Sequence, residues 1–305
     1  MQGCAVGGRS DHFGQVYAWG FCTHGQLGIK ERILGAREYV EAPSLVGGGS
    51  ILEDVEVKAA ACGHFHTLLA DTQGNVYAFG RDDRGQLGQS GEDTDEPGEK
   101  RGAVPKRLRN LANFLVTNVI CGAFHSLVVT ADGMLLSWGW NQHGQLGRHT
   151  NYQTDAEPGR VGEVQANRQS LLAAGRVVSV AAGLSHSAAV LSSGQVLTWG
   201  SNERGQLGVG PEVRHPDVAS LPVFVNGVIG HSVAAGDTHL LVLTTDGAVV
   251  AAGDATYGRL GPAPFVAEEV EKARNGHFVR VRRLLRPEEE ENDEHIMLVA
   301  AGGAT

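Results

Sequence analysis

One phrase returns four times along this chain of 305 residues: a short apolar run ending in an aromatic residue and Gly, a polar loop, and then Gly-Gln-Leu-Gly. A fifth, more divergent copy ends in Gly-Arg-Leu-Gly. A long, regular period decides the architecture, because each unit must stack on its neighbours to bury its apolar face. The five signatures occupy residues 16–28, 76–88, 135–147, 196–208 and 249–261.

The spacing shows that the repeat extends over nearly the whole chain. The first Gly of each signature is Gly25, Gly85, Gly144, Gly205 or Gly258, so the steps are 60, 59, 61 and 53 residues. A second motif, Gly-x-x-His, advances with it and ends at His66, His125, His186 and His239. We therefore expect a single repeat domain over residues 1–305.

The sequence pattern within a unit is typical of short antiparallel strands. Apolar runs at Val177–Ala182, His186–Leu191 and Val196–Trp199 are separated by Gly-containing breaks, and Leu221–Val225 is a less regular fourth run. Such runs, bounded by tight turns, predict hairpins rather than helices. Four strands in a unit of this size are typical of a propeller blade, so we predict an all-β propeller of four-stranded antiparallel blades.

The motifs G-x-x-H, G-x-(V/L)-aromatic-x-(W/F)-G and N/D-x-x-G-Q-L-G resemble those of the regulator of chromosome condensation family of β-propellers, over roughly residues 3 to 305. Members of that family usually have seven blades, whereas five signatures are visible here. A smaller ring, diverged blades and a longer chain are the alternatives. At the N-terminus, either residues 4–8 form a first strand of their own or the two termini complete one blade.

Charge, cysteine use and the N-terminus bound the class of protein. The net charge is −9 and the isoelectric point is near 5.8, which disfavours a nucleic-acid partner because phosphate binding needs a basic face. Cys62 and Cys121 share one repeat position that later holds Ala, so we expect thiols in a reducing compartment. No signal sequence or apolar run of membrane-spanning length is present, so we expect an intracellular protein, cytoplasmic or nuclear, without membrane contact.

The residues that recur in every unit are interpreted as structural. Histidines repeated without a recurring Cys or carboxylate beside them favour buried rings bonded to backbone in their own unit, rather than metal ligands. The Gly-Gln-Leu-Gly loops lack the Lys-Ser/Thr of a phosphate loop, so each Leu is interpreted as a plug between units. No cofactor or metal is expected. This structural set is His66, His125, His186, His239, Leu27, Leu87, Leu146, Leu207 and Leu260.

Function is expected where the units differ, because repetition encodes the scaffold. Trp140 stands alone in its loop and is suited to anchor a partner. The acidic run Glu288, Glu289, Glu290 and Glu291 is either a solvated loop or a docking element for a basic surface. The loops after each aromatic-Gly step are expected to share one face, and their candidate partner-binding residues are Arg81, Asp82, Asp83, Arg84, Asn141, His143, Asn202, Glu203 and Arg204.

No catalytic motif stands out from the repeats, and no small-molecule substrate is evident. The leading hypothesis is therefore a non-catalytic scaffold that presents loops to other proteins. The resemblance implies an alternative, a guanine-nucleotide exchange factor for a small GTPase, for which the segment 261–302 is long enough to supply a wedge. Chromatin binding is a third possibility, disfavoured by the acidic charge.

Overall fold

The computed structural model describes residues 3–9, 12–29, 38–47, 52, 54–89, 102–162, 175–210, 220–261 and 276–281, with backbone alone for residues 3–9 and 12–14. It divides into two compact units. Unit 1 comprises residues 1–141 and 150–160 together with Thr305, and unit 2 comprises residues 142–149 and 161–304.

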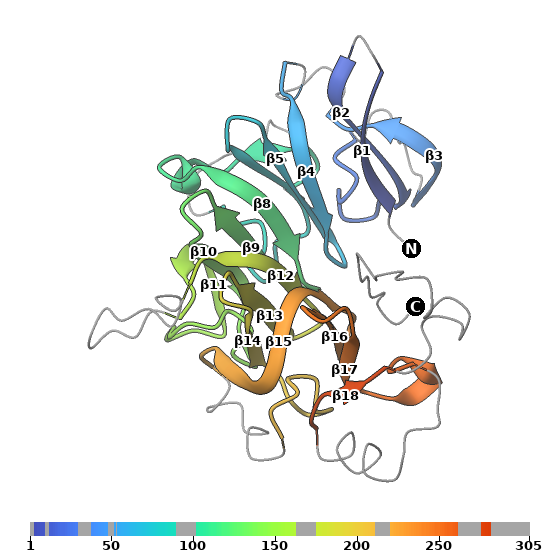
Figure 1. Ribbon diagram of the computed structural model, residues 1–305. Coiled ribbons are helices and arrows are strands. Elements are labelled where there is room, and N and C mark those ends of the chain that lie inside the picture. The colour runs from blue at the N-terminus through green and yellow to red at the C-terminus, as the bar shows by residue number, and fades with distance from the viewer. Residues whose placement is uncertain are drawn as a thin grey trace. The chain divides into compact units, whose positions relative to one another are not determined.

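Unit 1 contains three antiparallel sheets (Figure 1). The first has the order β1 (Gly3–Arg9), β2 (His12–Phe21), β3 (Tyr39–Leu45). The second has the order β4 (Val57–Cys62), β5 (His66–Asp71), β6 (Val76–Gly80), β7 (Lys106–Arg107). The third is built from β8 (Val116–Cys121), β9 (His125–Thr130), β10 (Leu135–Trp140) and β11 (Thr154–Arg160), and the 3-10 turn η1 (Arg109–Leu111) precedes it.

The N-terminal residues thus form a strand of their own. β1 pairs antiparallel with β2, with Gly3 opposite Trp19 and Val6 opposite Val16. The sequence left two alternatives for the N-terminus, and the pairing agrees with the one in which residues 4–8 form a first strand of their own. The counterpart segment near residue 301 lies outside the described residues.

Unit 2 contains one seven-stranded sheet made from two consecutive repeats. Its strands are β12 (Val177–Ala182), β13 (His186–Leu191), β14 (Gln195–Gly200), β15 (Val223–Ala235), β16 (His239–Thr244), β17 (Val249–Gly253) and β18 (Val279–Arg280). The 3-10 turn η4 (Thr256–Gly258) follows β17. The prediction of an all-β protein with four-stranded antiparallel units is confirmed.

β15 is long because it serves two repeats. Its first part pairs with β14, with Phe224 opposite Leu197, and its second part pairs with β16, with Val233 opposite Val242. The sequence showed only the run Leu221–Val225 here. The connection is the shortest between successive repeats, so the outer strand of one repeat continues directly into the inner strand of the next.

The predicted hairpin turns form as expected. In the turn between β5 and β6, the Asp71 carboxylate accepts hydrogen bonds from the backbone N–H groups of Gln73 and Asn75, at 2.9 and 2.8 Å. Its other oxygen accepts from the Tyr77 hydroxyl, and burial together with the Asp71 charge raises the pKa of Tyr77 to about 12. Gly74, like its equivalents in the later repeats, has a φ near +80°, which favours Gly.

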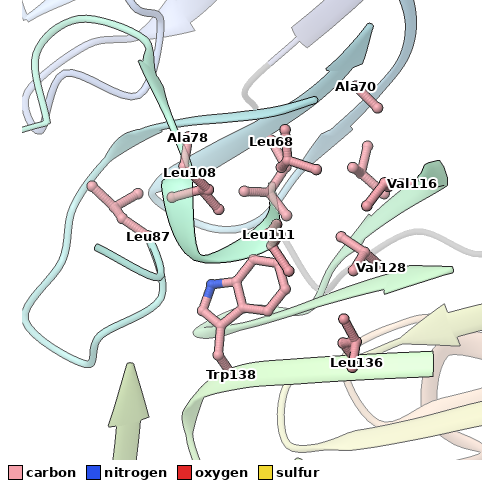
Figure 2. Packing of buried hydrophobic residues seen from close by; sticks show 12 residues of the cluster. Leu68, Ala70, Ala78, Leu87, Leu108, Leu111, Val116, Val128, Leu136 and Trp138 are labelled. Atoms are coloured by element: carbon pink, nitrogen blue, oxygen red, sulfur yellow. The ribbon is translucent and has the colours of Figure 1, made fainter. Parts of the chain in front are cut away.

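The core of unit 1 lies between neighbouring sheets. Figure 2 shows the indole of Trp138 on β10 among Leu87, Leu108 and Leu111, which come from the preceding repeat. All four are at most 3% exposed. Phe79, Trp138 and Trp199 each pack onto the signature loop of the repeat before them, which joins successive repeats by apolar burial.

The signature Gln carries the polar part of the same junction, which we call the clasp. The Gln86 carbonyl accepts hydrogen bonds from Ser126 Oγ at 2.7 Å and from Trp138 Nε1 at 3.0 Å, both in the next repeat. In unit 2 the Gln145 carbonyl accepts from Ser187 Oγ and Trp199 Nε1 at 3.1 and 2.9 Å. The buried Gln carbonyl is thus paired across the junction.

The last Gly of each signature makes room for the aromatic ring of the following repeat. A Cβ on Gly88 would lie 2.7 Å from Trp138 Nε1, and one on Gly147 would lie 2.7 Å from Trp199 Nε1. In the fifth repeat Ala252 replaces the aromatic residue. The ring of Phe278 lies against Gly208 instead: a Cβ added to Gly208 would lie 2.1 Å from it.

A Gly88→Ala substitution should therefore destabilise the fold more than its backbone angle alone requires. Gly227 is the control: its φ of +76° resembles the +70° of Gly88, but nothing lies within 4 Å of an added Cβ. Gly227→Ala should cost about 1 kcal/mol. Gly88→Ala should cost about 1–2 kcal/mol more, because the indole must move. Urea unfolding of both variants tests this, and equal losses would contradict the ring contact.

Among the residues that the structure describes, no helix has the length and apolar character needed to cross a membrane.

Candidate functional site

In four successive repeats one backbone hydrogen bond holds two loop residues together. The backbone N–H of the residue after the aromatic-Gly step donates to the carbonyl of the residue before the repeated His, as in Arg81 N to Phe65 O at 2.8 Å and Trp140 N to Phe124 O at 3.0 Å. Gly80 and Gly139 make the bend, with φ near +110°. The fold therefore brings these two positions beside each other in all four of these repeats. What those side chains are differs between the units.

In unit 1 three residues at these positions, Phe65, Phe124 and Trp140, form a continuous group of rings with two neighbouring loop histidines, His24 and His64. We call these five residues the aromatic row. The ring centroids of Phe65 and Phe124 lie 6.2 Å apart, and those of Phe124 and Trp140 lie 5.7 Å apart at an interplanar angle of 85°. His24 approaches Phe65 to 5.0 Å, and His64 approaches Phe124 to 5.7 Å. Three consecutive repeats contribute to the row.

Two guanidinium groups lie on the faces of these rings. Arg81 Cζ is 5.5 Å from the Phe65 centroid, and Arg84 Cζ is 5.7 Å from the Trp140 centroid. Arg81 also donates to Asp83 Oδ2 at 2.7 Å, whereas Arg84 Nε is 3.9 Å from the same oxygen. The side chain of Arg84 is 49% exposed. Arg84 is thus held over the indole while about half of its side chain remains exposed to solvent.

The row is only partly covered. Phe65, Phe124, Trp140 and His24 are half-buried, and His64 is exposed. Partly exposed aromatic and Arg side chains are the types that contribute most to binding energy at protein interfaces. Of the residues predicted from the sequence, the structure brings Arg81, Asp83, Arg84 and Trp140 together here.

Other predicted residues serve their own loops. Asp82 Oδ1 accepts the Leu87 N–H at 2.9 Å, and Asn202 Oδ1 accepts the Leu207 N–H at 3.0 Å. Asn202 also donates to the Gly210 carbonyl and is 2% exposed, so we leave it out of the candidate surface. This is the reason that the signature carries Asn or Asp at this position: its side chain caps the turn.

The remaining predicted residues lie apart from the row or outside the described residues. Asn141 donates its backbone N–H to the Gln153 carbonyl in unit 1, and the His143 N–H donates to Gln145 Oε1 in unit 2. Glu203 and Arg204 are exposed in unit 2. The acidic run Glu288, Glu289, Glu290 and Glu291 lies outside the described residues.

The repeated histidines are buried beside the Gly of their own motif. His66, His125 and His186 are 0% exposed, and His239 is 7% exposed. His66 Nε2 lies 3.0 Å from Ser126 Oγ in the next repeat, not against backbone of its own repeat as the sequence suggested. Because the Ser126 proton goes to the Gln86 carbonyl, His66 must donate from Nε2. The ring therefore extends the clasp.

Burial keeps the rings of His66 and His186 neutral. Burial, with a smaller contribution from His64, lowers the pKa of His66 to about 3, and burial, with a smaller contribution from His239, lowers that of His186 to about 4. Burial also lowers the pKa of His239. In unit 2 the place of Ser126 is taken by Leu240, so His186 lacks the hydroxyl partner that His66 has. The signature leucines Leu27, Leu87, Leu146, Leu207 and Leu260 are at most 1% exposed.

Sequence reasoning missed Phe65 and Phe124, which were treated as variable positions of the Gly-x-x-His motif. The signal was present: this position reads Phe, Phe, Ser and Thr in successive repeats, ending with Ser185 and Thr238. The paired position reads Arg81, Trp140, Ser201 and Asp254. Comparing the repeats position by position would have placed an aromatic group in the first half of the chain.

The chemistry available at the row is that of binding. Within the described ranges no three His, Cys, Asp or Glu side chains gather in a way that could hold a metal ion. The row offers ring edges, two guanidinium groups and one carboxylate. Such groups recognise complementary side chains by stacking and charge-assisted hydrogen bonds.

Comparison with sequence families gives a match over most of the chain. The model for the regulator of chromosome condensation (RCC1) repeat matches residues 14–70, 73–129, 132–190 and 193–243. Among curated relatives, the probable E3 ubiquitin-protein ligase HERC6 of Homo sapiens is 34% identical over 256 residues, covering 82% of this chain. The ultraviolet-B receptor UVR8 of Arabidopsis thaliana is 31% identical over 248 residues, covering 81%. The chain spans 22% of the length of the first relative and 50% of the second.

Solved structures give the same fold. Human WBSCR16 is similar with a TM-score of 0.70 and 26% identity, covering 90% of this chain and 64% of that one. Prp20p of Saccharomyces cerevisiae, described together with its binding properties to Gsp1p and histones, has a TM-score of 0.71 and 25% identity, covering 95% of this chain and 63% of that one. These likenesses confirm the β-propeller fold that the sequence predicted.

Proposed function

Because this chain belongs to the regulator of chromosome condensation (RCC1) repeat family, we propose that it is a non-catalytic interaction module that docks a partner protein on the aromatic row of unit 1. The observation that carries this proposal is the stacking of Arg84 on Trp140 next to Phe124, with the guanidinium half exposed. This arrangement gives the surface an aromatic anchor and a preoriented cation.

The difference between the repeats supports this assignment. The same backbone hydrogen bond joins Phe65 to Arg81 in unit 1 and Ser185 to Ser201 in unit 2. The bond needs no particular side chain, so the fold does not require Phe or Arg at these positions. Half-buried rings that the fold does not need are best explained by a partner.

A charge reversal at the row should remove the partner. We expect Arg84→Glu to reduce capture of the partner by about tenfold or more, because a charge-assisted contact contributes roughly 1.5–3 kcal/mol. Arg204→Glu is the matched control: it occupies the same repeat position and is also exposed, but in the following repeat Thr238 and Asp254 take the places that Phe124 and Trp140 hold beside Arg84. Affinity purification with quantitative mass spectrometry compares the two variants with the parent protein. Equal partner lists for Arg84→Glu and the parent would contradict the proposal.

The exchange-factor alternative is separated by a different assay. Prp20p was described with its binding to Gsp1p, and the segment nominated as a wedge in this chain lies largely outside the described residues. Release of fluorescent nucleotide from a panel of small GTPases tests it, with deletion of Glu288–Glu294 as the control. Accelerated release that needs this segment would replace the scaffold proposal by exchange activity.

A further inference from the structure

We propose that the occupant of the aromatic row is an acidic peptide segment of the partner that carries an apolar or aromatic side chain next to its carboxylate. The carboxylate would pair with Arg84, and the apolar side chain would lie against Phe124 and Trp140. This inference rests on the proposed docking function and specifies the chemistry of the partner.

The charge already present on the row disfavours a cationic ligand. Aromatic faces attract Lys and Arg side chains, but here Arg81 and Arg84 of the chain itself occupy the faces of Phe65 and Trp140. A basic peptide would have to displace a guanidinium and would meet its charge. What the row presents to a partner is the outer surface of these cations and the edges of the rings.

The two guanidinium groups are not equivalent. Arg81 donates to Asp83 at 2.7 Å, so its charge is compensated within its own loop. The nearest approach of Arg84 to that carboxylate is 3.9 Å at Nε, and Arg84 is the more exposed of the two, at 49% against 35%. A planar guanidinium fixed by stacking offers parallel N–H groups that match a carboxylate. Arg84 is therefore the group that selects an acidic residue.

A single-stranded nucleic acid would need a different surface. Successive bases stack on aromatic faces that lie open and follow a basic groove. Here the rings meet at angles of 40° to 87°, and the loop between them carries Asp82 and Asp83. A short acidic peptide that places one carboxylate against Arg84 needs one cation of this loop, whereas a run of phosphates would also meet the carboxylates of Asp82 and Asp83.

The experiment is a selection of random nine-residue peptides displayed on phage against the full chain. We expect the enriched peptides to contain Asp or Glu within two positions of an aromatic or aliphatic residue. A synthetic, fluorescein-labelled copy of the most enriched peptide is then titrated by fluorescence polarisation. Its affinity should fall tenfold or more in Arg84→Glu and Trp140→Ala, and should change less than twofold in Arg204→Glu.

Several outcomes would overturn the inference. They are enrichment of basic or uncharged peptides, failure to enrich any peptide, and binding that survives Arg84→Glu. Circular dichroism of each variant excludes unfolding, and Arg84→Lys, which keeps the charge without the planar fork, should bind with intermediate affinity. If partner capture needs Arg84 but the peptides are not acidic, the docking function stands and the peptide chemistry is wrong. If capture does not need Arg84, the docking site itself is wrong.

Discussion

Replacement of Trp138 by Ala is expected to lower the free energy of unfolding by about 3–5 kcal/mol, the usual cost of removing a large buried aromatic side chain. Trp138 is 0% exposed and packs against Leu87, Leu108 and Leu111 of the preceding repeat. The substitution opens a cavity at that junction and removes one of the two donors to the Gln86 carbonyl. Urea unfolding monitored by far-ultraviolet circular dichroism measures the loss.

Trp138→Phe separates the cavity from the hydrogen bond. The repeat already uses Phe79 at the equivalent position, where it is 0% exposed. Ser126 Oγ would still donate to Gln86, so the carbonyl keeps a partner. We expect Trp138→Phe to cost about 1–2 kcal/mol. A loss below 1 kcal/mol for Trp138→Ala would show that the signature aromatics do not hold neighbouring repeats together.

The protein is expected to lose stability steeply as the pH falls from 7 to 5. The pKa values of His66 and His186 are lowered to about 3 and about 4 by burial. In the unfolded chain the pKa of His is about 6.5, so protons bind the unfolded state first. The stability that the neutral rings provide is complete above pH 6.5 and is lost progressively toward pH 3–4. Each of the two rings should cost about 2 kcal/mol between pH 7 and pH 5.

The control for this prediction compares how steeply the free energy of unfolding changes with pH, not its value at one pH. His66→Gln and His186→Gln remove the titrating group, so each variant should depend less on pH between 7 and 5, even where it is less stable at pH 7. The carboxyl groups of Asp132, Asp246 and Asp254, whose pKa values are lowered below 3.8, do not titrate in this range. Equal slopes in parent and variants would contradict neutral, buried rings.

The fold could be predicted from the sequence because its determinants recur. Glycines with positive φ, turn tripeptides and buried leucines each appear once per repeat, so a chance match at one place is corrected by the others. Two features of the fold were not predicted from the sequence because they do not recur. β15 spans two repeats at the shortest connection, and Phe278 reaches Gly208 from a distant segment to replace the missing aromatic of the fifth repeat.

The candidate site could be predicted only in part, for the opposite reason. Arg81, Arg84 and Trp140 were visible as departures from the repeat, but Phe65 and Phe124 were hidden in a motif position treated as free. Their meeting depends on the backbone bonds from Arg81 to Phe65 and from Trp140 to Phe124, which the sequence does not show. Asn202 failed as a surface residue because the same loop geometry turns its side chain inward.

Trp138 and Trp140 stand two residues apart on β10 and are expected to differ entirely in role. The most direct measurement is partner binding by Trp138→Phe and Trp140→Ala at equal concentrations of folded protein, with the free energy of unfolding of each. Trp138→Phe should lose stability and keep its partner, whereas Trp140→Ala should cost no more than about 1–2 kcal/mol, the worth of its contacts with Phe124 and Arg84, and should lose binding tenfold or more. A Trp140→Ala protein that binds like the parent, or a Trp138→Phe protein that folds as stably but binds no partner, would contradict this division between recurring and differing residues.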